Sequence, residues 1–259
     1  MGNSDAGVRS VLEDGVLVLT LDRPSKKNAL TRAMYRALTD GLSRAAADPE
    51  VRVVHLRGEG GSFTAGNDLL DFMEDPPGPE GGPVVDFLRA LVAFDKPLLA
   101  EVAGAAIGIG TTMLLHCDLV LVADDAKLRM PFSTLGLCPE AGASLLLPQL
   151  VGRLRANALL MLADTLSGKE AAAIGLANRA VPADDLPDAA RSLALRLAEL
   201  PLPSLVATKA LMRRAHAPAL EDVMRAEFAV FSERLRSPEA MEAMQAFFEK
   251  RPPDFRQFS

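Results

Sequence analysis

Short apolar segments alternate with helical segments over the first two thirds of the chain. Residues 51–58, 98–104 and 118–124 are rich in Val, Leu and Ala and are too short to be buried helices. Helical segments are predicted between them, the first of these through residues 88–94. Strands that are joined through helices pair in parallel, by right-handed crossovers that cover the faces of the sheet. The sequence therefore predicts an α/β fold with a largely parallel sheet.

Local signals predict where other elements begin and end. Asp14 and Gly15 lie between alternating apolar residues, which is typical of a β-hairpin turn. Thr31 is suited to cap the N-terminus of a helix that Asp48 and Pro49 would end. The segment 111–117 predicts a further, apolar helix.

The character of the sequence changes after about Pro182. Ala- and Leu-rich helical segments are predicted over residues 186–200, 204–215, 219–235 and 238–250, and Ser237 followed by Pro238 is a favourable helix start. We therefore predict an α/β core over residues 1–182 and a C-terminal helical region over residues 183–259.

Composition and charge exclude several classes of protein. The 259-residue chain has a net charge of -6, opposite in sign to a typical nucleic-acid binder. No apolar run approaches the roughly 20 residues that span a bilayer, and the N-terminus has no apolar signal segment. Cys117 and Cys138 have no metal-binding spacing. We expect a cytoplasmic protein without a metal site that binds neither nucleic acid nor membranes.

Two glycine-rich loops, at residues 58–68 and 104–110, each lie between a predicted strand and a helix. Such loops offer free backbone N–H groups to an anion. A dinucleotide fingerprint fails because Met113 stands where its last glycine belongs, and no lysine follows as in a phosphate-binding P-loop. Two interpretations stay open. The loops either form an oxyanion hole together or are ordinary strand–helix turns.

The Pro- and Gly-rich stretch at residues 74–83 is the best candidate for a mobile loop near a binding site. An inert surface loop is the alternative.

Five motifs, in order between residues 12 and 255, resemble the enoyl-CoA hydratase/isomerase (crotonase) superfamily. They read DRPSKKNAL, GSFTAGNDLLDF, KPLLAEVAGAAIGIGTTMLLHCDLVLVADDAKL, LSGKEAAAIGLANRAV and AFFEKRPPDF. The resemblance implies an α/β fold built as a spiral of ββα units, with a C-terminal helical trimerisation region. It also implies a homotrimer or a hexamer, an acyl-CoA thioester as substrate, and no cofactor apart from the coenzyme A of that substrate.

The resemblance further implies which residues form the site. The N–H groups of Asn67 and Ile109 would bind the thioester carbonyl as an oxyanion hole. Contacts with the rest of the substrate would come from Lys26, Lys27, Ala65, Gly66, Asp68, Gly108, Thr112, Phe132, Leu135 and Lys250. For the lysines, solvated surface charges are an open alternative.

Departures from the family pattern predict the reaction. The resemblance places the two glutamates of the hydratases at Thr112 and Phe132, and neither residue can act as a general base. The segment LGLCPEAG instead resembles the peroxisomal-type Δ3,Δ2-enoyl-CoA isomerases, which use one glutamate. We therefore expect Glu140 to be the single acid/base of an enoyl-CoA isomerase. Its apolar pocket is expected to be lined by Met130, Phe132, Leu135 and Leu137.

Several alternatives remain at the level of sequence. Glu140 could merely cap a helix that begins near Ala141, where the helix dipole favours a carboxylate. The protein could be a hydratase, an isomerase of ring-bearing acyl-CoA substrates of the phenylacetate type, or a non-catalytic acyl-CoA binder. His116 lies in an apolar segment and is expected to be a core or hydrogen-bonded histidine.

Overall fold

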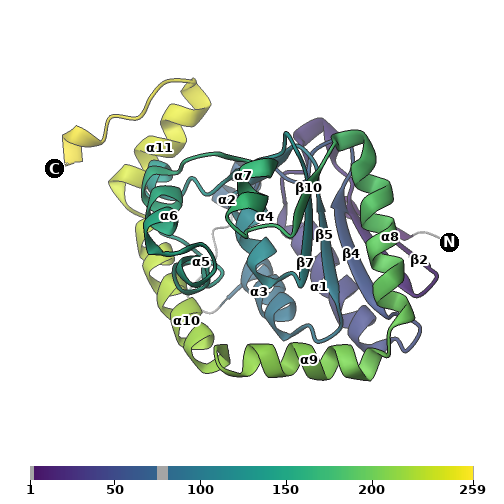
Figure 1. Ribbon diagram of the computed structural model, residues 1–259. Helices are drawn as coiled ribbons and strands as arrows, with labels where there is room; N and C mark the ends of the chain where they lie inside the picture. The colour runs from purple at the N-terminus through teal and green to yellow at the C-terminus, as the bar shows by residue number, and fades with distance from the viewer. Residues whose placement is uncertain (1–2, 75–80, 259) are drawn as a thin grey trace.

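The computed structural model describes residues 3–74 and 81–258 and has a seven-stranded sheet at its centre (Figure 1). The last five strands of this sheet run parallel, and the first two extend it as antiparallel strands. The expected α/β fold with a largely parallel sheet is confirmed. In order across the sheet, the strands are β1 (Asn3–Asp5), β2 (Val8–Glu13), β3 (Val16–Leu21), β4 (Val53–Gly58), β5 (Leu98–Val102), β7 (Leu119–Ala123) and β10 (Arg179–Val181).

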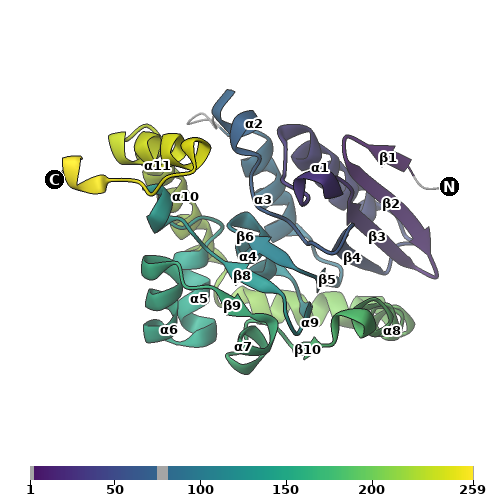
Figure 2. The same cartoon turned by 90° about the horizontal axis from the view of Figure 1, so that it is seen from above.

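A second, three-stranded sheet lies beside the first (Figure 2). Its middle strand pairs in parallel with one neighbour and antiparallel with the other. In order across this sheet, the strands are β6 (Ala105–Ile107), β8 (Lys127–Arg129) and β9 (Leu166–Ser167).

Helices cover both faces of the large sheet and continue around one side of the molecule. The α-helices are α1 (Arg32–Ala47), α2 (Leu69–Glu74), α3 (Pro83–Ala93), α4 (Ile109–Thr112), α5 (Ala143–Val151), α6 (Arg153–Asn157), α7 (Gly168–Ala173), α8 (Leu186–Glu199), α9 (Leu202–Arg214), α10 (Ala217–Arg234) and α11 (Pro238–Glu249). The 3-10 turns are η1 (Pro24–Lys26), η2 (Met113–His116), η3 (Ser133–Leu135), η5 (Ala183–Asp185) and η6 (Phe255–Phe258), and η4 (Ala158–Leu162) is a π-turn.

The C-terminal helices wrap around the core. Helix α8 lies on one face of the large sheet, with α1 and α3 on the other (Figures 1 and 2). Helix α9 then runs along the lower edge in Figure 1, α10 rises beside α5, and α11 ends above α6. The C-terminal region therefore reaches the segments that follow β8, far from it in sequence.

The local signals in the sequence are confirmed. Asp14 and Gly15 both have positive φ, 51° and 77°, as the tight turn between β2 and β3 requires. The Thr31 hydroxyl accepts a hydrogen bond from Met34 N at 3.2 Å, and Ser237 caps α11 in the same way.

One expected helix is wrong in form. The segment 111–117 contains the end of α4 and the 3-10 turn η2 rather than one helix. Asp118 N donates to Leu98 O at 2.8 Å, so the chain must already be extended at Cys117 to join β5. Only about two turns fit between Gly108 and this point.

Two further expectations concern residues 74–83. The helix expected through residues 88–94 begins within this stretch, at Pro83, with proline at the favoured first position. The predicted mobile loop lies mostly outside the described residues. None of the described helices is long and apolar enough to cross a membrane.

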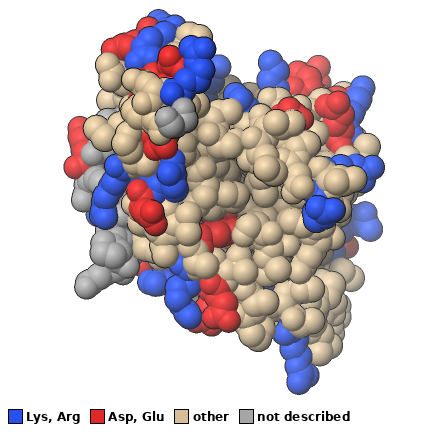
Figure 3. Space-filling model, turned by 90° about the vertical axis from the view of Figure 1, so that its left-hand side faces the viewer, with Lys and Arg blue, Asp and Glu red and all other residues tan. Residues whose placement is uncertain are grey.

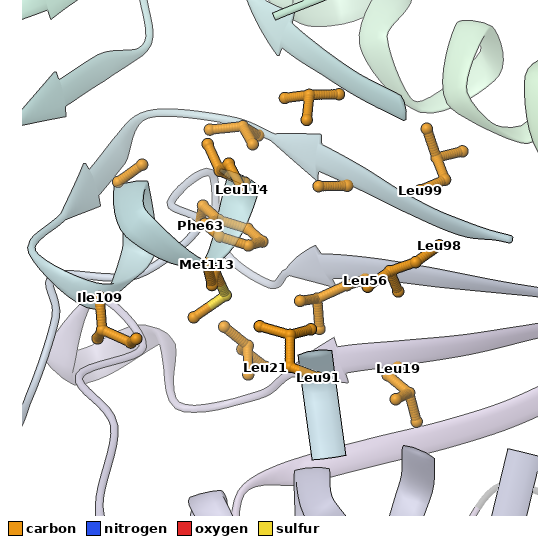
Figure 4. Packing of buried hydrophobic residues seen from close by; sticks show 14 of the residues in the cluster. Leu19, Leu21, Leu56, Phe63, Leu91, Leu98, Leu99, Ile109, Met113 and Leu114 are labelled. Atoms are coloured by element: carbon orange, nitrogen blue, oxygen red, sulfur yellow. The ribbon is translucent and has the colours of Figure 1, made fainter. Parts of the chain in front are cut away.

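The main hydrophobic core connects the large sheet to both glycine-rich loops. Phe63 from the first loop and Met113 from η2 are fully buried and lie beside each other (Figure 4). Leu21 of β3 and Leu91 of α3 lie next to them. The loops are thus anchored by packing as well as by hydrogen bonds.

Asn28 fixes the chain next to the first loop. The residue is fully buried and has a φ of 55°, a left-handed conformation that asparagine tolerates better than most residues. Its side chain accepts from Arg23 N at 2.9 Å and donates to Glu59 O at 2.9 Å and Ser62 O at 2.7 Å. One side chain therefore makes hydrogen bonds with three main-chain groups.

We expect Asn28→Ala to lower the free energy of unfolding by about 2–4 kcal/mol, because it leaves buried backbone groups unpaired at a positive φ. Urea denaturation measures the change. The neighbouring Lys26→Ala, at an exposed position, should change stability by less than about 0.5 kcal/mol. Equal effects of the two substitutions would contradict the role given to Asn28.

Candidate active site

The two glycine-rich loops are hydrogen-bonded to each other. Thr64 N donates to Ala105 O at 2.8 Å, and Ile107 N donates to Thr64 O at 3.0 Å. These bonds form a parallel bridge between Thr64 and Ala106. The loops that the sequence could not place relative to each other are therefore adjacent.

Glycines make this close approach possible. Gly66 has a φ of 90°, and a Cβ there would lie 2.8 Å from Ile107 O. A Cβ at Gly110 would lie 2.5 Å from the Thr64 methyl carbon. Both positions exclude a larger side chain unless the loops move apart.

Two backbone amides of the loops are left without a protein acceptor. Within residues 3–74 and 81–258, neither Asn67 N nor Ile109 N donates to another group of the chain. Their neighbours are engaged, since Asp68 N donates to Leu30 O and Gly108 N to Arg129 O, each at 2.8 Å. Two free donors on adjacent loops are what an oxyanion hole requires. That role stays a prediction.

Glu140 lies in an irregular segment between η3 and α5. Its exposed fraction is 9%, and its Oε1 has no hydrogen-bond partner among the described residues. Ala141 and Gly142 follow with positive φ values of 59° and 72°. A left-handed alanine is uncommon, so this turn must be held by its surroundings.

Glu140 forms part of the wall of a largely apolar cavity of about 930 Å³. The cavity lies among α3, α5, α9 and α10, and its apolar lining includes Val84, Leu88, Leu146 and Met224. Its size is within the range of small-molecule sites. Four residues were expected around Glu140, and none of them lines this cavity: Met130, Phe132, Leu135 and Leu137.

The surroundings of Glu140 raise its pKa to about 8. Burial is the larger cause, and the negative charge of Glu227 adds to it. The sequence left open whether burial or a nearby helix N-terminus would dominate. Burial dominates.

Glu227 of α10 caps helix α5. Its carboxylate accepts from Gly142 N at 2.6 Å, from Ser144 N at 2.8 Å and from Ser144 Oγ at 2.6 Å. The alternative that Glu140 caps this helix is therefore wrong, and the helix begins at Ala143 rather than near Ala141. A carboxylate from a distant helix occupies the positive end of the helix instead.

His116 supports the same turn from η2. Its Nε2 lies 2.7 Å from Ala141 O, and because a carbonyl only accepts, Nε2 carries the proton. Burial lowers the pKa of His116 to about 4, so the ring is neutral. The expectation of a hydrogen-bonded core histidine is confirmed, and its partner is the residue next to Glu140.

Tyr35 of α1 holds the Asn67 side chain of the first loop. The buried Tyr35 hydroxyl donates to Asn67 Oδ1 at 2.5 Å. Burial, and then the charge of Glu140, raise the pKa of Tyr35 well above its usual value. Glu140 is thus close enough to act electrostatically on the group that holds the Asn67 side chain.

Residues expected to contact coenzyme A divide into two places. Ala65 N donates to Lys27 O at 2.9 Å, and Asp68 pairs with Arg23 at 2.6 Å, so Lys26, Lys27, Ala65 and Asp68 lie along one edge of the first loop. Lys250 is exposed at the end of α11, outside this group of contacts.

The two positions that the family resemblance assigns to the hydratase glutamates are occupied by Thr112 and Phe132. Thr112 is fully buried, and its hydroxyl donates to Gly108 O at 3.4 Å. Phe132 is buried at the start of η3, and Leu135 ends that turn. Within the described ranges, no group of three or more His, Cys, Asp or Glu residues is arranged to hold a metal ion.

Sequence reasoning missed Glu227 and Tyr35. A signal for Glu227 is present, since it lies on the inward face of α10 together with Met224 and Phe231, at helical spacing. An acid within an apolar stripe indicates a buried partner. For Tyr35, which fits the buried face of an amphipathic helix, the sequence contains no such signal.

Comparison with known proteins identifies relatives of the whole chain. Residues 12–258 match the family model for enoyl-CoA hydratase/isomerase. A 1,2-epoxyphenylacetyl-CoA isomerase from Escherichia coli is 35% identical, with 96% of this chain and 97% of the relative aligned. Enoyl-CoA delta isomerase 2 from Rattus norvegicus is 33% identical over 95% of this chain and 64% of its own.

Solved structures of similar proteins have the same fold as this chain. The structure of OdaA from Pseudomonas aeruginosa superposes with a TM-score of 0.91 at 49% identity, covering 93% of this chain and 98% of that one. An enoyl-CoA hydratase/isomerase from Pseudoalteromonas atlantica also has a TM-score of 0.91, at 40% identity, covering 96% and 99%.

The pKa of Glu140 predicts a pH dependence of stability. Between about pH 4.5 and about pH 8 the folded protein keeps a proton on Glu140 that the unfolded chain has lost, so the free energy of unfolding falls as pH rises. Glu140→Gln cannot lose this proton. Its stability relative to wild type should therefore rise by about 1–4 kcal/mol between about pH 5 and about pH 9.

Urea denaturation over this pH range measures the difference. The exposed Glu50→Gln variant is the control for the loss of one negative charge. A stability difference for Glu140→Gln that does not change with pH would show that Glu140 is ionised throughout.

Proposed function

Because the chain belongs to the enoyl-CoA hydratase/isomerase (crotonase) family and has its fold, we propose that it is an enoyl-CoA isomerase. It moves the double bond of a 3-enoyl-CoA thioester to the conjugated 2-enoyl position. Coenzyme A enters as part of the substrate, and the reaction uses no further cofactor.

The proposed reaction uses one base and one oxyanion hole. The amides of Asn67 and Ile109 bind the thioester oxygen and stabilise the dienolate that forms when a proton leaves C2. Glu140 takes that proton and returns one at C4, so the same carboxyl group acts as base and then as acid. The proton count is unchanged and no water is consumed.

One observation carries this proposal. Glu140 is a carboxyl group with an unpaired oxygen on an apolar cavity. The family resemblance assigns the positions of the hydratase glutamates to Thr112 and Phe132, and neither residue is an acid. A base with a pKa near 8 is strong enough to compete for a weakly acidic carbon-bound proton and remains partly ionised near neutral pH. Hydration would need a second group to activate water.

The relatives include isomerases and hydratases by name, and one of the isomerases suggests a second substrate class. Both the rat delta isomerase and the bacterial 1,2-epoxyphenylacetyl-CoA isomerase are isomerases by name. The second acts on a ring-bearing acyl group, and a cavity of about 930 Å³ has room for a ring. A ring-bearing acyl-CoA is therefore the alternative substrate.

The arrangement of the first loop supports a place for coenzyme A. Lys26 and Lys27 are exposed beside Ala65, at the outer edge of the loop that carries Asn67. We propose that this edge binds the nucleotide part of coenzyme A. Lys250, on α11, would reach a substrate in a neighbouring subunit.

An exposed apolar surface supports a homotrimer or a dimer of trimers. Leu154 of α6 is 76% exposed, and Met161 and Leu162 of η4 are each 69% exposed. Viewed from the side of α6 and α10, the molecule has a broad area free of Lys, Arg, Asp and Glu (Figure 3). Exposed apolar side chains and an area without charged residues are typical of a subunit interface.

Glu140→Gln should lower kcat for conversion of trans-3-hexenoyl-CoA to the 2-enoyl product by about 10²–10⁴-fold, as expected for removal of a general base. The absorbance of the conjugated product measures the rate. In the wild type, kcat/KM should rise about tenfold per pH unit up to about pH 8, because Glu140 must be ionised.

The hydration of crotonyl-CoA and the isomerisation of a ring-bearing 3-enoyl-CoA are measured in parallel, with Glu50→Gln as the control. Fast hydration that Glu140→Gln leaves intact would contradict the proposal and require another residue to activate water. Binding of acyl-CoA without turnover of any substrate would instead identify a non-catalytic binder.

Leu154→Glu should reduce the mass measured by light scattering from that of three or six chains toward one chain, because it places a charge in the proposed interface. The exposed Leu70→Glu, on α2, is the control. A wild-type protein with the mass of a single chain would contradict the proposed assembly.

A further inference from the structure

The turn that carries Glu140 is held by a residue that the proposed reaction does not use. Glu227 is 8% exposed and comes from α10, in the C-terminal helical region. Its three hydrogen bonds all end on residues 142 and 144, directly after Glu140. A second buried acid so close to the proposed base calls for a physical reason.

We propose that Glu227 is a positioning residue for Glu140: it occupies the N-terminus of α5 and thereby leaves the Glu140 carboxyl group unpaired at the cavity. This inference rests on the proposed function for its catalytic meaning. The geometry itself stands on contacts that do not depend on any substrate.

The free amides at a helix N-terminus attract the nearest carboxylate. Glu140 precedes the N-cap residue Gly142 by two positions and is the nearest acid along the chain. Glu227 binds Gly142 N and both polar groups of Ser144, so these donors are no longer available. Glu140 consequently keeps a free oxygen.

The same contact acts on charge. A carboxylate bound to helix amides has a lowered pKa, whereas a carboxyl group beside another negative charge has a raised one. With Glu227 in place, Glu140 lies beside a negative charge and does not bind the helix amides. Burial raises the pKa of Glu140, and the charge of Glu227 raises it further. Without Glu227, Glu140 would lose a neighbouring negative charge and gain access to the helix amides. Both changes would lower the pKa of Glu140.

The contact also fixes the unusual backbone. Ala141 and Gly142 are both left-handed, and at the alanine this conformation disfavours the turn in an unconstrained chain. His116 Nε2 holds Ala141 O from one side, and Glu227 holds Gly142 N from the other. The position of Glu140 is thus defined between η2 and α10.

Other contacts bring the C-terminal region to this segment. Arg234 Nε donates to Gly136 O at 3.1 Å, and Cys138 Sγ lies 3.7 Å from Glu227 O. A Cβ on Gly142 would collide with Leu220 Cδ1. Helix α10 therefore packs directly over the proposed base.

The titratable groups around Glu140 come from four places. Glu227 of α10, Tyr35 of α1 and Cys138 of its own segment interact with it electrostatically. His116 of η2 is hydrogen-bonded to the next residue, Ala141. Other charged or titratable residues that line the cavity are Arg89, Arg213, His216, Glu221 and Arg225. Of all these, Glu227 is the acid joined by hydrogen bonds to the Glu140 turn.

Glu227→Gln tests the proposal, because an amide can accept from Ser144 but its NH₂ group cannot accept from Gly142 N. We expect the acidic limb of the kcat/KM profile to move down by about one pH unit or more. The plateau of kcat should fall by about 10–100-fold, since the base is less well positioned. In Glu227→Asp the acidic limb should lie between those of Glu227→Gln and the wild type. Glu233→Gln, an exposed position on the same helix, should match wild type in both.

A second readout does not require activity. The pH dependence of the stability difference caused by Glu140→Gln is measured in the wild-type and in the Glu227→Gln background. We expect the midpoint of this dependence to be lower in the second background. Full-length variants are used throughout.

The two proposals fail in different ways. An unchanged pH limb and an unchanged stability midpoint in Glu227→Gln would overturn the role of Glu227. Isomerisation that is insensitive to Glu140→Gln, together with a shifted stability midpoint, would overturn the proposed function and leave the electrostatic role of Glu227 intact. If Glu227→Gln does not fold, Glu227→Asp is compared with wild type instead: its shorter side chain reaches the N-terminus of α5 less well, so the pH limb and the stability midpoint should move in the same direction by a smaller amount, and no movement of either would overturn the role of Glu227.

Discussion

The main-chain hydrogen bonds between the two glycine-rich loops are the constraint on which the site depends. They join Thr64 to Ala105 and Ile107, and they require glycine at positions 66 and 110 because the backbones approach so closely. Each loop follows a strand of a parallel sheet and is anchored in the core. The free amides of Asn67 and Ile109 lie close to this pairing, and the amides next to them are engaged elsewhere, Asp68 N with Leu30 O and Gly108 N with Arg129 O.

Much of the fold was predictable because its signals are local. The alternation of strands and helices, the turn at Asp14 and Gly15 and the cap at Thr31 each depend on a few neighbouring residues. The break between α4 and η2 was not predictable, because it follows from Asp118 pairing with Leu98, twenty positions earlier. Tertiary pairing overrides local helix preference there.

The site divides in the same way. Motifs pointed to Glu140 and to the two loops, because each lies within one short segment. Glu227 lies 87 positions after Glu140, and only the path of α9 and α10 around the core brings it to the N-terminus of α5. For the same reason the sequence could not decide between burial and the helix dipole as the main influence on Glu140. The answer depends on which carboxylate occupies the N-terminus of α5.

This competition bears on why one fold supports several reactions. In the proposed reaction the core supplies donors for a thioester oxygen, and the segment after η3 supplies a carboxyl group. Whether that group is a strong base or a helix cap is decided by α10, outside the core. A high pKa favours a shift of one proton between two carbons, in which the same group must both accept and donate. Sequence changes in the C-terminal helices could thus alter the chemistry without altering the oxyanion loops, which agrees with the general rule that function is a property of the site and not of the fold.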